Sequence, residues 1–482
     1  MQSFFWHDYE TFGADPVHDR PAQFAGVRTD PDLNIIGEPV TLYARPAEDY
    51  VPDPVATMVT GITPQDCLND GLPEAEFIQR INDLFLEPGT CAVGYNSLRF
   101  DDEVTRHTLY RNLRDPYARE WKNGNSRWDI IDMVRLAHAV RPEGIEWPTH
   151  EDGRPSFRLE DLTAANGIEH GAAHDAMADV YATIEVARLI RDRQPKLFDY
   201  VLRHRDKRSV LSMLDTGNIK PVLHISAMYP SEQGCCALVA PVAAHPVNRN
   251  SVIVFDLRQD PRMLEGVSAD ALRERLFKPS DQRSEGDEPR PALKEIRANT
   301  CPVVAPAAML KELPQERLER FGLDREKLRA NLDALRRMEG LAERLQRVYG
   351  ESPEGGVRDP DEALYSGGFI GDSDRRRLQE VLDTPPGLLG ELEPPDFEDP
   401  RLPELFFRYR ARNYPQSLSA DEQERWERFR HQRLMEPGNG WRSLPGFFED
   451  LQQRMADPSL SRRDQLLLQD LQFYGESLIP SL

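Results

Sequence analysis

The sequence predicts an α/β fold in its first part, a β-rich segment in its middle and an all-helical C-terminal part. Three patterns lead to this prediction. Strand-like apolar runs alternate with helical patterns over residues 1–195, short strand-like runs separated by Pro, Gly and Asn follow, and helical periodicity returns over residues 401–482. At roughly 150 residues per domain, a chain of 482 residues has room for about three domains.

Residues 1–195 are interpreted as one α/β unit. Apolar and aromatic runs predict strands at Ser3–Tyr9, Gln23–Thr29 and Thr90–Tyr95. Helical spacing of apolar residues predicts helices at Ala75–Leu86, Asp102–Leu113, Trp128–Val140 and His174–Arg191. Strands that alternate with helices in this way favour a sheet covered by helices.

Residues 196–350 have a different pattern. Short apolar runs predict strands at Pro221–Tyr229, Cys235–Val242 and Val252–Leu257, which together indicate a small β-rich insert or barrel. A long helical stretch, Asp324–Tyr349, carries leucines at helical spacing and is expected to follow the strands.

Residues 351–400 are acidic and rich in proline, with fourteen acidic residues against four arginines. This composition predicts a solvated connector with one short helix around Ser373–Leu382. Helical periodicity then predicts a C-terminal domain over 401–482, with helices at Arg401–Arg412, Ala420–Leu434, Trp441–Met455 and Ser461–Leu478.

Composition and charge exclude several classes of protein. Hydrophobic residues make up 39% of the chain, which excludes a wholly disordered protein, and the net charge of −22 excludes a globally basic nucleic-acid coat protein. The five cysteines have no C-x-x-C spacing, so neither a disulfide framework nor a zinc site of that type is indicated. No apolar run reaches 18 residues and the N-terminal run is too short for a signal peptide, so we expect a cytoplasmic protein without a membrane segment.

The first chemical motif, His7-Asp8-Tyr9-Glu10-Thr11-Phe12-Gly13, closes the first predicted strand. Side chains alternate along a strand, so Asp8 and Glu10 share one face. Two carboxylates on one face repel each other unless a cation lies between them, and hard oxygen ligands suit Mg²⁺ or Mn²⁺. The competing interpretation of this pair is a strand end that faces solvent.

Two further motifs place acids at the starts of predicted helices. Asp101 follows the strand that ends near Tyr95, where it serves either as a helix cap or, if Asp102 and Glu103 share the capping, as a metal ligand. His174 and Asp179 are five residues apart and cannot stack on one helical stripe. If His174 lies just before the first helical turn, its ring can swing toward Asp179, while Asp175 serves the helix N-terminus.

The combination D-x-E, N-x₃-F-D and H-x₄-D, in this order within one α/β unit, resembles the DEDDh exonuclease superfamily. In that superfamily four acids and a histidine form the active site, and here they correspond to Asp8, Glu10, Asp101, Asp179 and His174. The resemblance covers about the first 190 residues. The histidine and its spacing indicate the branch that uses histidine rather than tyrosine.

Longer segments resemble bacterial exodeoxyribonuclease I, and they are spread from residue 7 to residue 413: His7–Gly13, Asp19–Phe24, Gly61–Gln65, Arg99–Arg106, Asn166–His170, Ala173–Thr183 and Tyr409–Asn413. This resemblance implies an RNase H-like nuclease domain with a mixed sheet, an SH3-like β-rich domain and a helical C-terminal domain. It also implies a single-strand-specific exonuclease that degrades DNA from the 3′ end, releases nucleoside 5′-monophosphates and acts in DNA repair and recombination. With the composition, it gives domain boundaries of 1–195, 196–350, 351–400 and 401–482.

Hydrolysis of a phosphodiester bond with two Mg²⁺ ions, for which Mn²⁺ can substitute, is the expected mechanism. Asp8 is expected to bridge both ions, Glu10 and Asp179 to complete the site of the attacking water, and Asp101 to help the other ion through water. Glu10 is also expected to contact the substrate. His174 is expected to take the proton from the attacking water, since the natural pKa of histidine lies near working pH.

A strand-binding track is expected in residues 99–141, where nine basic residues outnumber seven acidic ones and aromatic residues are interleaved. The residues expected to bind the strand are Arg99, Arg106, Tyr117, Trp121, Arg135 and, as a phosphate clamp near the metals, Arg158. Trp128 and Tyr110 fit either this track or the core. The second basic cluster, Arg203, Arg205, Lys207 and Arg208, is either a solvated helix face or an extension of the track.

The C-terminal tail of the single-stranded DNA-binding protein is a partner that the resemblance implies. That tail is acidic with an apolar end, but Arg141, Lys220 and Arg317 cannot be ranked as its site from the sequence. One chain is expected to form the whole channel, as a monomer. Rival interpretations are a DEDDh enzyme that trims RNA or proofreads, a catalytically silent single-strand-binding module, and an interaction scaffold; about 290 residues beyond the nuclease motifs argue against the first.

Overall fold

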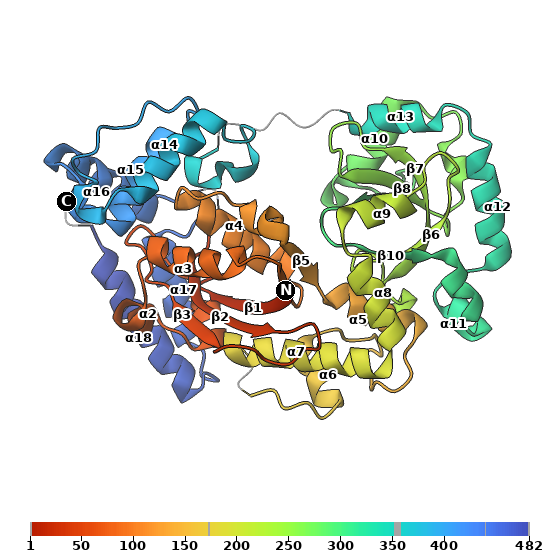
Figure 1. Ribbon diagram of the computed structural model, residues 1–482, viewed down its shortest axis with the longest axis horizontal. Coiled ribbons are helices and arrows are strands. Elements are labelled where there is room, and N and C mark those ends of the chain that lie inside the picture. Colours follow the sequence, from red (N-terminus) through yellow and green to blue (C-terminus); the bar gives the residue numbers. More distant parts are fainter. Residues whose placement is uncertain (1, 172–173, 351–357, 439, 481–482) are drawn as a thin grey trace. The chain divides into compact units, whose positions relative to one another are not determined.

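The computed structural model describes residues 2–171, 174–350, 358–438 and 440–480 (Figure 1). Contacts divide the described residues into two compact units. Unit 1 comprises 1–127, 170–183 and 355–482, and unit 2 comprises 128–169 and 184–354. The two ends of the chain therefore belong to the same unit, although a long segment separates them in sequence.

A five-stranded mixed sheet starts the fold, with the strand order β3-β2-β1-β4-β5. Its strands are β1 (Ser3–Thr11), β2 (Pro21–Thr29), β3 (Val40–Tyr43), β4 (Thr90–Gly94) and β5 (Ser126–Asp129). The central strand β1 is antiparallel to β2 and parallel to β4. Asp8 lies opposite Ala25 of β2, and Glu10 lies opposite Gln23.

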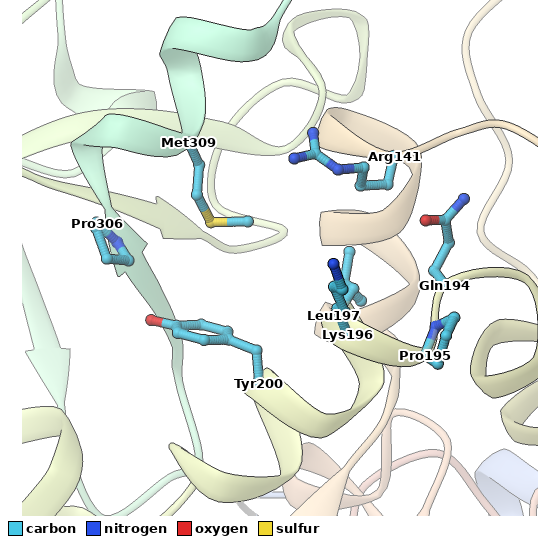
Figure 2. Close-up of a pocket in the computed structure, with 8 residues that line it drawn as sticks. All are labelled: Arg141, Gln194, Pro195, Lys196, Leu197, Tyr200, Pro306 and Met309. Atoms are coloured by element: carbon cyan, nitrogen blue, oxygen red, sulfur yellow. The ribbon is translucent and has the colours of Figure 1, made fainter.

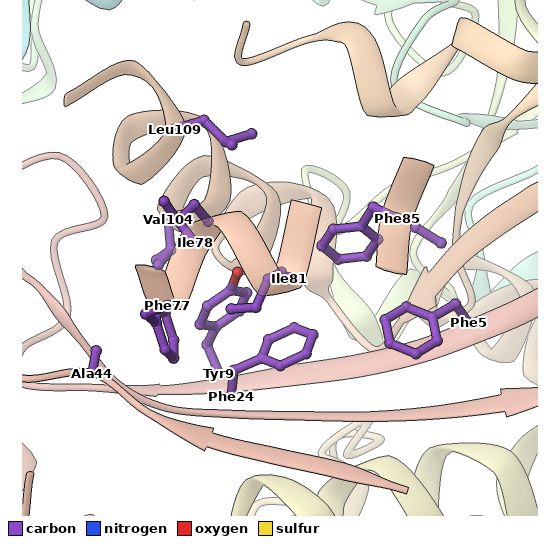
Figure 3. Packing of buried hydrophobic residues seen from close by; sticks show 11 residues of the cluster. Phe5, Tyr9, Phe24, Ala44, Phe77, Ile78, Ile81, Phe85, Val104 and Leu109 are labelled. Atoms are coloured by element: carbon purple, nitrogen blue, oxygen red, sulfur yellow. The ribbon is translucent and has the colours of Figure 1, made fainter. Parts of the chain in front are cut away.

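Alternation along β1 separates the core of unit 1 from its chemistry. Phe5 and Tyr9 point to the face that α3 (Glu74–Leu86) and α4 (Asp101–Arg111) cover, and they pack there against Phe85 and Phe24 (Figure 3). The rings of Phe5 and Phe85 are 5.5 Å apart and those of Tyr9 and Phe24 are 4.9 Å apart. Edge-to-face contacts of this kind add about 0.5–1.5 kcal/mol beyond area burial. Because the period of a strand is two, the alternate residues Asp8 and Glu10 face the other way.

The remaining helices of the N-terminal part are short and well capped. They are α1 (Pro54–Thr60), α2 (Pro64–Asp70) and the start of α7 (Ala176–Arg193). In α2, Thr63 and Asp66 form a capping box, and in α1 the Asp53 side chain accepts from Val55 N. Gly61 ends α1 with a φ of 75°, a left-handed conformation that costs glycine little.

Unit 2 is built on a second five-stranded sheet, with the strand order β10-β6-β7-β8-β9 and antiparallel neighbours throughout. Its strands are β6 (Val222–Ile225), β7 (Cys236–Ala244), β8 (Ser251–Asp256), β9 (Leu293–Arg297) and β10 (Val303–Pro306). The helices of this unit are α5 (Ile131–Val140), α6 (Leu159–Ala165), α8 (Pro195–Arg203), α9 (Lys207–Met213), α10 (Ala269–Phe277), α11 (Gln315–Arg320), α12 (Arg325–Arg336) and α13 (Leu341–Tyr349).

The C-terminal helices complete unit 1. They are α14 (Asp372–Asp383), α15 (Leu402–Asn413), α16 (Ala420–Met435), α17 (Leu444–Met455) and α18 (Arg462–Leu478). Leu402 and Leu405 of α15 pack with Ala75 and Tyr110 of the N-terminal part, and Phe447 of α17 belongs to a cluster that includes Val51. The C-terminal helices thus share hydrophobic cores with helices and a loop of the N-terminal part.

The predicted succession of an α/β part with a mixed sheet, a β-rich part and a helical part is confirmed. Two expected elements are wrong in detail. Trp128 does not begin a helix but lies in β5, and the predicted long helix 324–349 is two helices, because Gly340 takes a φ of 66° between α12 and α13. The strands β3, β5, β9 and β10, each four or five residues long, are not among the predicted strands.

The acidic stretch 351–400 differs from the solvated connector that its composition predicts. Residues 351–357 lie outside the described residues, but Leu364, Leu378, Val381 and Leu389 are buried in the same cluster as Leu402. The expected short helix is present as α14. Apolar residues at the spacing of this helix therefore outweigh the acidic composition of the stretch.

No helix in the described part of the chain is long and apolar enough to cross a bilayer.

A buried charge network joins the N-terminal and C-terminal parts of unit 1. Asp49 and Asp361 are each only 2% exposed. Asp361 accepts hydrogen bonds from Arg412 at 2.6 Å, Arg408 at 2.9 Å and Arg433 at 3.2 Å, and Arg412 also donates to Asp49 at 2.8 Å. Burial alone would raise the pKa of Asp361, but Arg412 and Arg408 hold that pKa well below its usual range.

Asp361→Asn should lower the free energy of unfolding by about 3–5 kcal/mol, because it leaves buried arginines without a counter-charge. The pKa of Asp361 is depressed in the folded state, so its contribution is present above about pH 4 and is lost as the pH falls further. Urea unfolding between pH 3 and 7 measures both effects. The matched control is Asp372→Asn, whose side chain is 93% exposed beside Arg375 and should change stability by less than about 0.5 kcal/mol. Equal stability of Asp361→Asn and the parent protein would contradict the stabilising role of Asp361 in this network.

Candidate active site

Three acidic side chains meet where β1 ends. Asp8 and Glu10 occupy the β1 positions that alternate with the core residues Tyr9 and Phe5, and Glu10 is only 9% exposed. Asp101 is the first residue of α4, and its Oδ1 accepts a hydrogen bond from Tyr9 N at 3.0 Å. This bond attaches the start of α4 to β1 between Asp8 and Glu10.

The turn between β4 and α4 explains how Asp101 arrives there. A Cβ on Gly94 would lie 2.5 Å from Ser97 Cβ, so only glycine fits at the end of β4. Asn96 then takes a φ of 60°, a left-handed conformation that asparagine tolerates better than most residues. A short 3₁₀ turn, Ser97–Arg99, follows and ends next to the first turn of α4.

His174 lies just before α7, as the spacing of the third motif predicts. It is exposed and takes a φ of 68°. Asp175 serves the helix N-terminus, because its Oδ1 accepts from Ala178 N at 3.1 Å. Gln23 of β2 supports the same turn: its Oε1 accepts from Ala176 N at 3.0 Å, and its Nε2 donates to Asp175 at 3.4 Å.

The structure brings the predicted metal ligands and the histidine together. One ligand atom from each of Glu10, His174 and Asp179 lies within 4.8 Å of the other two. Burial and then the charges of Asp101, Glu10 and Asp179 raise the pKa of Asp8 well above its usual range. The predicted residues Asp8, Glu10, Asp101, Asp179 and His174 therefore occupy one site.

The pKa of Glu10 is also raised, to about 8. Burial is the main cause, and the negative charges of Asp179, Asp101 and Asp175 add to it. Carboxylates that disfavour each other's ionised form in this way are stabilised by a divalent cation among them. The donor set consists of hard carboxylate oxygens with one imidazole at its edge, which suits Mg²⁺ or Mn²⁺ better than softer metals.

Sequence reasoning missed two residues that hold this site. His170 Nε2 lies 2.5 Å from Asp179 Oδ1, and the His170 side chain is 8% exposed. Gln23 is 2% exposed and binds the turn before α7. Both residues stand in segments that resemble the exonuclease family, but only the folded structure shows what they contact.

The residues expected to bind the strand differ in their exposure and in whether a carboxylate of this chain pairs with them. In unit 1, Arg99 is exposed two residues before Asp101, and Trp121 is 67% exposed. Tyr117 is half-buried, and its ring meets that of Phe369 edge-on at 5.9 Å. Phe369 is 83% exposed and was not predicted, since it lies in the acidic stretch.

Arg106 and Arg135 are different, because carboxylates of this chain already occupy them. Arg106 binds Glu103 at 2.6 Å and Glu120 at 2.8 Å, and Arg135 of unit 2 binds Asp132 at 2.6 Å. Their charge is therefore neutralised inside the protein.

Arg158, also in unit 2, is 63% exposed and pairs with Glu160. Trp128 and Tyr110, which fitted either the track or the core, are core residues at 1% and 3% exposure.

Unit 2 contains a pocket of about 550 Å³ (Figure 2). Its lining is mostly apolar with two basic residues: Arg141, Gln194, Pro195, Lys196, Leu197, Tyr200, Pro306 and Met309. Tyr200 is held in place by a hydrogen bond to Val304 O at 2.9 Å, and Arg141 donates to Val140 O at 2.7 Å and pairs with Glu312. The pocket offers an apolar recess beside positive charge, which suits an apolar group next to an anion.

Family models match nearly the whole chain in three consecutive parts. The model described as Exonuclease matches residues 5–187, the Exonuclease I SH3-like domain matches 205–351, and the Exonuclease I C-terminal domain matches 358–478. The expected SH3-like and C-terminal domains are confirmed by these matches, while the exact boundaries 1–195, 196–350, 351–400 and 401–482 stay predictions.

Relatives of known name and structure are similar over their full length. Exodeoxyribonuclease I of Escherichia coli is 44% identical over 99% of this chain and 98% of its own. A structure of exonuclease I from Methylocaldum szegediense is 51% identical, with a TM-score of 0.94 over 99% of this chain and 100% of its own. E. coli exonuclease I in complex with a dA16 oligonucleotide is 44% identical, with a TM-score of 0.93 over 99% and 100% of the two chains.

Two further structures with 43% identity contain other ligands. One is described as SSB/exonuclease I in complex with an inhibitor, with a TM-score of 0.90, and the other as the zinc-bound form of the E. coli complex with single-stranded DNA, with a TM-score of 0.92. Each covers 99% of this chain and 100% of its own.

Proposed function

The chain belongs to the exodeoxyribonuclease I family, and on this premise we propose how its own residues carry out the reaction. It is a 3′–5′ exodeoxyribonuclease that acts on single-stranded DNA. The observation that carries the proposal is the convergence of Glu10, His174 and Asp179 within 4.8 Å of one another. We propose that the products are nucleoside 5′-monophosphates and that the enzyme acts as a monomer in the cytoplasm, in DNA repair and recombination.

The exonuclease domain implies dependence on a divalent metal. We propose that Asp8, Glu10, Asp101 and Asp179 hold a pair of Mg²⁺ ions, with Mn²⁺ as a substitute. The fit rests on the chemistry of the donors. Glu10 and Asp101 are buried and Asp8 and Asp179 are half-buried, and the pKa values of Asp8 and Glu10 are raised. When bound, such ions stabilise charge on the phosphate and lower the pKa of the attacking water.

His174 is proposed to take the proton from that water. Its position in the loop before α7, its exposure and its nearness to Glu10 and Asp179 all suit a general base that meets the substrate from solvent. Asp101 is fixed by Tyr9 N and contributes a carboxylate that does not depend on loop motion. Gln23 holds the turn that carries His174 and is proposed to position it.

The exposed residues of unit 1 are proposed to bind the strand. Arg99 is suited to a phosphate, because it is exposed close to Asp101. Trp121 and Phe369 offer exposed rings, and Tyr117 lies edge-on against Phe369. Stacking of bases on aromatic rings tolerates any sequence, which suits an enzyme that degrades DNA without sequence preference.

We further propose that the pocket of unit 2 binds the C-terminal tail of the single-stranded DNA-binding protein, the partner that the solved SSB complex suggests. An apolar last residue fits against Tyr200, Pro306 and Met309, and the terminal carboxylate fits Arg141. An RNA-trimming activity is a weaker candidate, since the SH3-like and C-terminal matches are to exonuclease I.

His174→Ala should lower kcat about 10²–10⁴-fold, because the attacking water loses its base, while binding of Mn²⁺ is kept. The measurement combines calorimetry of Mn²⁺ binding with mononucleotide release from a 3′-labelled single strand, a matched duplex and a matched RNA strand, each in Mg²⁺ or EDTA. Asp8→Asn should lose both metal binding and activity. The control is His150→Ala, an exposed histidine in unit 2. Full turnover by His174→Ala would refute its role as the base.

Trp121→Ala should weaken binding of a single-stranded oligonucleotide about 5–150-fold with little change in kcat, since loss of one stacked base costs ~1–3 kcal/mol. Fluorescence anisotropy in EDTA measures binding without cleavage. Phe473→Ala is the matched control, because Phe473 on α18 is 65% exposed, almost as much as Trp121. Similar affinities for the two variants would argue against a stacking role for Trp121.

Arg141→Ala should weaken binding of an acidic peptide with an apolar C-terminal residue about 10–100-fold, because a charge-assisted contact worth ~1.5–3 kcal/mol is lost. Calorimetry with the free-acid and the amidated peptide measures the role of the carboxylate. Arg154→Ala, which changes an exposed arginine paired with Asp152 in the same unit, serves as the control. Unchanged affinity in Arg141→Ala would place the tail elsewhere.

A further inference from the structure

Two histidines approach the same carboxylate, Asp179, in different ways. His174 is exposed in the loop before α7, and one of its nitrogens lies within 4.8 Å of ligand atoms of Glu10 and Asp179. His170 is only 8% exposed, and its Nε2 lies 2.5 Å from Asp179 Oδ1. Of the two, only His174 lies in the group of three with Glu10 and Asp179, whereas His170 contacts Asp179 and is not in that group.

The setting of Asp179 explains why a fixed donor is useful there. A carboxylate oxygen of Asp179 lies within 4.8 Å of a carboxylate oxygen of Glu10, so the two negative charges repel each other. Without a partner, a carboxylate in that field is favoured to rotate away from the other acids. A hydrogen bond from a buried histidine opposes that rotation, and a buried donor loses little freedom when it forms the bond.

The His170–Asp179 contact also encloses the segment that carries His174. The two residues are nine positions apart in sequence, and His174 lies between them. Asp179 belongs to the first turn of α7, where Gln23 accepts a hydrogen bond from Ala176 N and Asp175 accepts one from Ala178 N. The contact thus connects the loop before His174 to the helix after it.

We infer that His170 is a positioning residue for the metal site: its Nε2–H donates to Asp179 Oδ1 and fixes the orientation in which this carboxylate can hold a divalent cation. Histidine and carboxylate groups behind metal ligands orient those ligands in many metal sites, and loss of such a group costs about 10–100-fold in metal affinity or activity. This inference rests on the proposed role of Asp179 as a metal ligand. It adds a residue to the site that the four acids and His174 do not include.

Calorimetric titration of the full-length protein with Mn²⁺, without DNA, tests the inference by a readout other than activity. His170→Leu should weaken Mn²⁺ binding about 10–100-fold. His170→Gln should restore most of the affinity, because the amide of glutamine places an N–H donor close to the position of Nε2. His170→Asn, whose amide is shorter, should not restore it. In the activity assay of His170→Leu, the Mg²⁺ concentration that gives half the maximal rate should rise by a larger factor than the factor by which kcat falls at saturating Mg²⁺.

The variants separate failure of this inference from failure of the proposed function. Parental Mn²⁺ affinity in His170→Leu would overturn the inference, whereas parental affinity in Asp179→Asn would overturn the assignment of Asp179 as a ligand. His150→Leu is the control for replacement of a histidine, and thermal unfolding checks that each variant is folded. If His170→Leu does not fold, the comparison of His170→Gln with His170→Asn decides, because equal Mn²⁺ affinities of these two would overturn the inference.

Discussion

Repulsion among carboxylates at the end of β1 is the constraint on which the rest of unit 1 depends. Asp8, Glu10, Asp101 and Asp179 are held where ionisation of each disfavours ionisation of the others. Such a site keeps its geometry only if the surrounding structure opposes the repulsion. The aromatic core beneath β1, the bond from Tyr9 N to Asp101 and the contact of Gln23 with the turn before α7 all do so. The cluster of acids is thus a local cost that the fold around it offsets.

Unit 1 also contains a second group of acids, whose neighbours are arginines rather than other carboxylates. Asp49 and Asp361 are surrounded by arginines, so their ionised forms are favoured without any bound ion. This network stabilises the attachment of the C-terminal helices, whereas the acids at the end of β1 remain available for a cation. The neighbouring charges, rather than burial alone, therefore distinguish a structural carboxylate from one suited to catalysis.

Much of the site could be predicted from the sequence, because the positions of its residues depend on short-range backbone geometry. The alternation of Asp8 and Glu10, the position of Asp101 after a strand and that of His174 before a helix follow from short-range geometry. The contacts of Gln23 and His170 were not predictable, since they join residues whose proximity the pattern does not encode. Arg106 and Arg135 each pair with a carboxylate of this chain, a contact that the basic and aromatic pattern does not encode, and their role in binding the strand stays a prediction. In the same way, Trp128 fitted a helical pattern that the sheet overrode.

Unit 1 combines segments from the beginning and the end of the chain, and this affects how it folds during synthesis. Ala75, Tyr110 and Val51 of its N-terminal part share hydrophobic cores with α15 and α17, which are synthesised near the end of the chain. On the ribosome, the nascent nuclease segment has to wait for the final hundred or so residues before its apolar surfaces are covered, while unit 2 can fold in the meantime. A chain cut short after the nuclease motifs would keep every residue of the active site and still expose Ala75, Tyr110 and Val51 to the solvent.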